Sequence, residues 1–149
     1  MKLKRCFILF SLLLAGLLCD AAPIHVTASS EHPGPHQAEY AFDNDFSTRW
    51  ATHLRHEKSF LQIDLGRAVP FDGIEIHWEH AFAKEYEIQI SQDQKNWVTI
   101  VSVTEGKDGK AIHNNLNDKA RYIRINCNTF GPYPLYSIWE VTFIGEKIN

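Results

Sequence analysis

The sequence predicts an all-β sandwich, and three observations favour that fold class. Short runs of alternating apolar and polar residues fill the chain after its first 21 residues. Gly, Pro, Asn and Asp residues separate these runs, as they do between the strands of antiparallel sheets. Helical periodicity is absent from the same part of the chain, which argues against a helical bundle.

About eight antiparallel strands are expected in a jelly-roll arrangement. The first is short and lies near 25–30, and the segment 33–52 that follows it reads as irregular. Each later strand is an alternating run bounded by turn residues. These runs lie at 60–65, 71–79, 85–91, 97–104, 110–116, 121–128 and 137–144.

The first 21 residues have the pattern of a signal peptide. Basic residues precede an apolar run at 6–18, which is too short to span a bilayer. Small residues at Cys19 and Ala21 place the expected cleavage after Ala21. The alternative is a lipoprotein lipidated on Cys19, although the bulky Leu18 precedes that cysteine. We expect export across the inner membrane to the periplasm, with one domain at 22–149.

The net charge and the cysteine content limit the possible ligands and the possible disulfides. The chain has a formal net charge of −3 at pH 7, which disfavours general binding to nucleic acids or anionic membranes. Cleavage after Ala21 would leave Cys127 as the one cysteine, so no internal disulfide is expected. Cys127 lies in an alternating run and is predicted to be a small core residue.

The loops expected at the two ends of the sandwich differ in composition. When consecutive strands run antiparallel, alternate connections share an end. The connections at one end look like plain turns: 66–70, 93–96 and 117–120. The other end would hold the connections at 52–59, 80–84, 105–109 and 129–136. Three of these four are rich in His, Arg, Lys and aromatic residues, so this end is the candidate binding site.

Several linked motifs indicate a family. The run AFDNDFSTRWAT at 41–52 resembles the A-D-G-x-x-x-T-R-W motif of discoidin domains, also called coagulation-factor type C domains. FLQIDLG, IHWEHAFAKEYEIQISQDQKNW, ARYIRI and YSIWEVTFIG follow in the family's order. The resemblance covers 25–145 and implies a discoidin-like sandwich. Within the family, the chain is similar to the family 32 carbohydrate-binding modules, and among them to solitary exported modules that bind polygalacturonate in pectin-degrading enterobacteria.

The resemblance also implies a structural calcium ion. Carried over by position, its ligands would be the side chains of Asp43, Thr48 and Glu140 and the carbonyls of Tyr40, Asp45, Thr48 and Trp139. A hard cation takes six to eight oxygens, which suits this mixture. Asn44 stands where the family usually has Gly, and Asn tolerates left-handed backbone geometry. The alternative is that Asp43 and Asp45 merely shape a turn.

Charged and aromatic side chains at the candidate end are the expected carbohydrate-binding residues. Arg55 can form a bidentate pair with a uronate, and Lys58 offers a point charge. Aromatic rings can stack on the apolar faces of sugars. The full set is His53, Arg55, His56, Lys58, His80, Lys84, Phe130, Tyr133 and Tyr136. It predicts binding of an acidic polysaccharide, polygalacturonate or pectin oligomers, by a monomer.

Some of these residues have alternative roles. The 53–58 segment could be only a solvated charged loop, and Tyr136 could belong to the core. His77 is interpreted as a strand-face residue. The four tryptophans are interpreted as core: Trp50, Trp78, Trp97 and Trp139.

Other functions stay open at this level. The same loops could bind a neutral galactoside, or they could serve an adhesin or other surface-interaction protein. An enzyme is not expected, because a glycosidase needs two carboxylates that flank a cleft. The candidate end offers only Glu31, Glu57 and Glu79, scattered over three segments.

Overall fold

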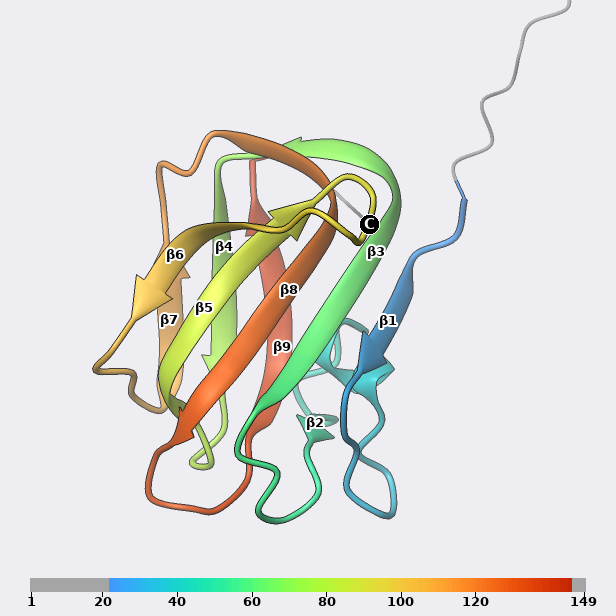
Figure 1. Ribbon diagram of the computed structural model, residues 1–149. Coiled ribbons are helices and arrows are strands. Elements are labelled where there is room, and N and C mark those ends of the chain that lie inside the picture. Colours follow the sequence, from blue (N-terminus) through green and yellow to red (C-terminus); the bar gives the residue numbers. More distant parts are fainter. Residues whose placement is uncertain (1–21, 146–149) are drawn as a thin grey trace, which may run out of the picture.

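The computed structural model describes residues 22–145 and shows nine strands and one short 3-10 helix (Figure 1). The predicted signal peptide and its cleavage site at Ala21 lie outside these residues and stay a prediction. The elements are β1 (His25–Ala28), η1 (Ala38–Ala41), β2 (Trp50–Ala51), β3 (Ser59–Phe71), β4 (Gly73–Trp78), β5 (Ala83–Ser91), β6 (Val98–Val103), β7 (Gly109–His113), β8 (Asp118–Phe130) and β9 (Ser137–Ile144).

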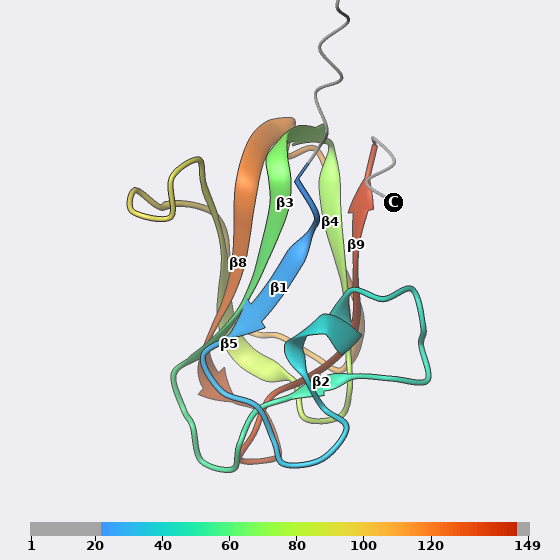
Figure 2. The same cartoon turned by 90° about the vertical axis from the view of Figure 1, so that its right-hand side faces the viewer.

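The strands form two antiparallel sheets, which confirms the predicted all-β sandwich. The five-stranded sheet has the order β1-β3-β8-β5-β6, and the four-stranded sheet has the order β2-β9-β4-β7. Figure 2 shows the two sheets on edge, with β1, β3 and β8 in one layer and β4 and β9 in the other. Neighbours far apart in sequence, such as β3 and β8, pair over most of their length.

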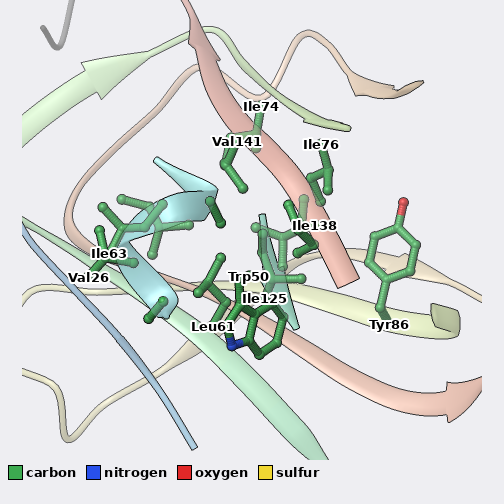
Figure 3. Packing of buried hydrophobic residues seen from close by; sticks show 14 of the residues in the cluster. Val26, Trp50, Leu61, Ile63, Ile74, Ile76, Tyr86, Ile125, Ile138 and Val141 are labelled. Carbon is green, nitrogen blue, oxygen red and sulfur yellow. The ribbon is translucent and has the colours of Figure 1, made fainter. Parts of the chain in front are cut away.

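The core lies between the sheets and follows the alternation read from the sequence. Ile74 and Ile76 of β4 face Ile123 and Ile125 of β8 within one buried cluster, part of which Figure 3 shows. Cys127 continues this inner face of β8 and is buried, as predicted. Its burial raises the pKa of the thiol, so the thiol stays protonated and unreactive at neutral pH.

Two of the three predicted plain turns are placed differently. Residues 66–70 lie inside β3, where the pairing with β8 shifts register between Asp64 and Val69. Gly66 makes this irregularity possible with a φ of 72°. The third turn lies at 114–117, because β8 already begins at Asp118. The expected turn at 93–96 is confirmed, with the Asp93 side chain accepting from the backbone N–H groups of Lys95 and Asn96.

Two of the four tryptophans are not core residues. Trp50 and Trp78 are buried, as predicted. Trp97 is only half-buried, with the Arg124 guanidinium 4.0 Å from its ring centroid. Trp139 is also half-buried. It lies at a register shift between β4 and β9, which turns its side chain away from the core.

No helix within residues 22–145 has the length and apolar character needed to cross a bilayer.

Candidate functional site

The connections predicted to share an end do so. In Figure 1 the connections β2–β3, β4–β5, β6–β7 and β8–β9 all lie at the lower end of the sandwich. The segment between β1 and η1 reaches the same end (Figure 2). Parity of antiparallel strands is therefore sufficient to group these loops from the sequence alone.

Two of these loops are tied directly to each other, and we call 52–58 and 131–136 the binding loops. The Arg55 backbone N–H donates to the carbonyl of Pro134 over 2.7 Å. The Thr52 N–H donates to the carbonyl of Tyr136 over 2.9 Å. The Tyr136 hydroxyl donates to the carbonyl of Glu57 over 2.5 Å. With the bond from the Tyr136 N–H to the Thr52 hydroxyl over 3.0 Å, four bonds hold the loops in a fixed relative position.

Arg55 has the most unusual backbone of the binding loops. Its φ is 63°, in the left-handed region that side chains other than Asn, Asp and Gly rarely adopt. Its side chain is exposed, and so is that of Lys58. Within residues 22–145 neither cation makes an ion pair with a carboxylate. This uncommon backbone geometry, together with the exposed guanidinium, makes Arg55 a candidate functional residue.

The aromatic candidates divide into one exposed ring and two that support it. Tyr133 is 51% exposed and lies next to Pro134, the acceptor for Arg55. Tyr136 is 0% exposed and is a core residue, so its predicted contact with a sugar is wrong. Phe130 is half-buried, with its ring centroid 4.7 Å from that of Tyr136. Phe130 therefore mainly packs against Tyr136 rather than presenting a free face.

His80 and Lys84 belong to the other side of the 131–136 loop. The β4–β5 connection is joined to that loop by bonds from the N–H of Gly131 to Phe82 and from the N–H of Ser137 to Ala81. His80 Nδ1 lies 3.0 Å from an oxygen of Asp108. The exposed Lys84 follows Ala83 at the start of β5. The 131–136 loop thus separates these two residues from Arg55.

The structure adds a cluster that the sequence interpretation missed. The four rings of His36, His32, His53 and His56 form a chain with successive centroid distances of 5.6, 6.3 and 5.9 Å. We call these residues the histidine row. No local sequence pattern signals this row: it forms because β1 runs antiparallel to β3, which places the segment after β1 beside the segment before β3.

The residues expected to hold calcium converge on one buried carboxylate, and we call Asp43, Thr48 and Glu140 the carboxylate pocket. Glu140 is 1% exposed, and its Oε2 has no hydrogen-bond partner within residues 22–145. The Thr48 hydroxyl lies 2.7 Å from Asp43 Oδ2 and 2.9 Å from the Asp45 carbonyl. Asn44 has a φ of 61°, so it adopts the left-handed turn in place of glycine.

Electrostatics in the carboxylate pocket are unfavourable without a cation. Burial raises the pKa of Glu140 to about 7 and the charge of Asp43 raises it too, while the backbone N–H groups of Asn44, Val141 and Asp43 lower it. An unpartnered buried carboxylate oxygen facing a second carboxylate fits a hard cation. Tyr40 lies within η1, which ends at Ala41 just before this loop, and Trp139 precedes Glu140 in β9. No group of three or more His, Cys, Asp or Glu side chains in the described part of the chain is placed to share a metal.

Comparison with known proteins agrees with the fold. The solved chitosan-binding module 1 from a chitosanase/glucanase of Paenibacillus sp. IK-5 is 30% identical, with a TM-score of 0.78 over 84% of this chain and 97% of that one. Module 2 of the same enzyme, solved with chitotriose, is 28% identical, with a TM-score of 0.79 over 84% and 98%. The family 32 module of NanJ from Clostridium perfringens, solved with galactose, is 21% identical, with a TM-score of 0.70 over 80% and 92%, and shows the fold alone. These neighbours are isolated binding modules.

Sequence comparison identifies the family. The non-catalytic subunit of the venom prothrombin activator pseutarin-C of Pseudonaja textilis is 32% identical over 99 residues. That segment is 56% of this chain but only 7% of the relative, so the likeness concerns one domain of a much longer protein. The F5/8 type C domain model matches residues 25–141. The chain therefore belongs to the F5/8 type C, or discoidin, domain family and has the fold of the family 32 carbohydrate-binding modules.

Proposed function

We propose that this protein is a non-catalytic carbohydrate-binding module whose ligand is an acidic polysaccharide, polygalacturonate or its oligomers. The proposal includes export to the periplasm. The observation that carries it is the exposed Arg55, whose left-handed backbone is bonded to Pro134, the residue after the exposed Tyr133. A planar guanidinium matches a carboxylate with two parallel hydrogen bonds.

The two binding loops supply complementary contacts to a uronate chain. The Tyr133 ring can cover the apolar face of one sugar, while Arg55 and Lys58 receive carboxylates. The sites are exposed, so each ion pair should contribute about 1 kcal/mol or less. Affinity should therefore come from several weak contacts along the chain, and added salt should weaken it.

Two of the three glutamates named for this end hold their own loops, which favours binding over hydrolysis. Glu31 accepts a hydrogen bond from the N–H of Ala38, and Glu79 accepts one from the N–H of Ala81. Both are thus engaged in holding their own loops. A glycosidase would need two carboxylates directed at one glycosidic bond. This arrangement favours a module that holds its ligand without transforming it.

Calcium is part of the same proposal. Asp43, Thr48 and Glu140 would hold it with side-chain oxygens, and the carbonyls of Tyr40, Asp45, Thr48 and Trp139 would complete the shell. The ion would supply positive charge to an otherwise repulsive pair of carboxylates. Its role would be structural, since it joins the 42–48 loop to β9 and has no place in the binding loops.

A second ligand class is favoured by a separate pocket. This pocket has a volume of about 260 Å³ and is lined by Trp78, Glu79, His80, Asp108, Gly109 and Trp139. Two carboxylates there would attract the ammonium groups of an amino-sugar polymer. Chitosan-binding modules are among the similar structures, at 28% and 30% identity. Chitosan is therefore the second candidate, followed by neutral galactans.

The test is calorimetric titration of the protein with polygalacturonate, chitosan oligomers and a neutral galactan. We expect binding to polygalacturonate and an affinity loss of about 5-fold or more for Arg55→Ala. Lys119→Ala is the matched control, because it removes the same charge from an exposed position at the start of β8, at the opposite end of the sandwich. Binding to chitosan without binding to polygalacturonate would replace the first candidate with the second.

A further inference from the structure

The histidine row joins two segments that lie far apart in the sequence. His32 and His36 belong to the connection between β1 and η1, while His53 and His56 belong to the first binding loop. The shortest centroid distance across the two segments is 6.3 Å, between His32 and His53. The row therefore extends from the binding loops onto a part of the surface that the proposed sugar contacts do not use.

Backbone bonds fix this juxtaposition. The His32 N–H donates to the carbonyl of Ala51 over 2.7 Å, and the Ala51 N–H donates to the carbonyl of His36 over 3.3 Å. The His53 N–H donates to the Ser30 hydroxyl over 3.0 Å. The buried Trp50 indole also donates to the Ser30 carbonyl. These bonds hold the backbone of the two segments side by side, so the four histidines project from a fixed part of the scaffold.

The row differs from the histidines that have acidic partners. His80 and His77 lie within hydrogen-bond reach of Asp108 and Glu75, respectively. Within residues 22–145 no row member makes such a contact with a carboxylate. A row that gathers several imidazoles without a counter-charge can accept an external anion when the rings are protonated.

Charged groups around the row come from every neighbouring segment. Glu31 lies beside His32, but one of its oxygens is bonded to the N–H of Ala38. Arg49 faces His36, and the other binding loop contributes two titratable groups, the exposed Tyr133 and the buried Tyr136. The first binding loop itself contributes Arg55, Glu57 and Lys58.

His36 stands apart from the other three members. Burial lowers its pKa, and the charge of Arg49 and the proximity of His32 lower it further. It is therefore harder to protonate than a free imidazole, and its ring packs edge-on against that of His32. Among the other three, His53 and His56 are exposed and His32 is half-buried like His36.

We propose that His32, His53 and His56 form a second edge of the acidic-glycan site, and that it takes carboxylates of the same polymer more tightly in mild acid. This inference rests on the proposed function, because it assumes a uronate ligand. Imidazole gains charge between about pH 8 and about pH 5, whereas sugar carboxylates stay ionised there because carboxyl groups titrate near about pH 4. A polyanion binds protonated imidazoles more tightly than neutral ones, so binding takes up protons.

The experiment is titration with polygalacturonate at about pH 8 and about pH 5.5, in buffers of different ionisation enthalpy that reveal proton uptake. We expect affinity to rise about 10-fold in acid, from three weak exposed pairs. His32→Gln and His53→Gln should each reduce the rise and the proton uptake. His25→Gln is the matched control, since His25 is an exposed histidine at the start of β1, away from the row.

The outcomes separate this inference from the function on which it rests. Equal affinity at both pH values, with Arg55→Ala still weakening binding, would overturn the inference and leave the acidic-glycan site intact. An acid-dependent rise that both glutamine variants leave unchanged would also overturn it. Absence of polygalacturonate binding at either pH would overturn both proposals.

Discussion

The carboxylate pocket and the binding loops both gather charge, but they do so in opposite ways. In the pocket, Glu140 is 1% exposed and one of its oxygens has no partner within residues 22–145. On the binding loops, Arg55 and Lys58 are exposed and water solvates them. The carboxylate pocket thus places desolvation and charge repulsion on one buried carboxylate. The binding loops distribute positive charge over several exposed side chains.

The difference determines the size of the effects that each region can produce. A buried carboxylate loses its hydration, so neutralising it changes stability strongly. Exposed cations keep their hydration and are screened by salt, so each contributes little. A single substitution in the pocket should therefore change the free energy of unfolding strongly. A single substitution in the loops should change ligand affinity only a little.

Removal of calcium should have the largest effect. A ligand that binds only the folded state stabilises it by about 4 kcal/mol at 1,000 times its Kd. Excess chelator should therefore lower the melting temperature by several degrees, and calcium should restore it. Scanning calorimetry with and without chelator measures this, and an unchanged melting temperature would contradict the proposed site.

Neutralising the buried carboxylate should act in the opposite direction in metal-free protein. At about pH 8, where the carboxylate is ionised, Glu140→Gln should raise the free energy of unfolding in chelator by about 1–2 kcal/mol, because it removes a buried charge and its repulsion with Asp43. It should also abolish the response to calcium. The matched control is Glu75→Gln, where the carboxylate is compensated by Lys110 and His77 and its removal should not stabilise.

A single hydroxyl connects the core to the binding loops and should have a smaller effect. Tyr136→Phe removes the bond to the Glu57 carbonyl and should cost about 1 kcal/mol of stability. It should also weaken polygalacturonate binding about 2-fold, because the loop that carries Arg55 loses a tether. Tyr86→Phe is the control: it removes a hydroxyl bonded to His113 inside the sandwich and should leave binding unchanged. Equal effects of the two variants on binding would argue against the tether.

Removal of one surface ammonium should give the smallest effect. Lys58→Ala should lower polygalacturonate affinity about 2-fold and leave the melting temperature unchanged, since the side chain is exposed and makes no ion pair with the residues that the structure describes. Titration at low salt, where screening is weakest, is the sensitive measurement. A loss as large as that of Arg55→Ala would show that charge alone matters, without the geometry of the guanidinium.

Much of the fold could be predicted from local patterns, and the exceptions have physical causes. Period-two alternation identified β4, β8 and β9, because each buries one face. It could not reveal that 66–70 continues β3, since Gly and Pro also occur at register shifts inside strands. Nor could it separate Trp97 and Trp139 from the buried tryptophans, because a register shift or a hairpin can place a ring on the outer face.

The location of the candidate site could be predicted from the sequence, but not all of its residues could. Strand parity placed the right loops together, and the structure brings Arg55 and Tyr133 onto adjoining loops. It could not show that Tyr136 faces inward, because a residue at a strand entrance can face either way. The histidine row escaped notice because His32 and His53 meet only through the register of β1 against β3.

The most direct test of the acidic-glycan proposal compares polygalacturonate with its methyl ester in calorimetric titrations at about 0.05 M and about 0.5 M salt. The ester keeps the sugar ring and removes the charge. We predict that the acid binds at least about 10-fold more tightly than the ester at low salt, and that high salt removes most of this advantage. Equal binding of acid and ester, with no dependence on salt, would contradict the account and indicate a site for neutral sugars.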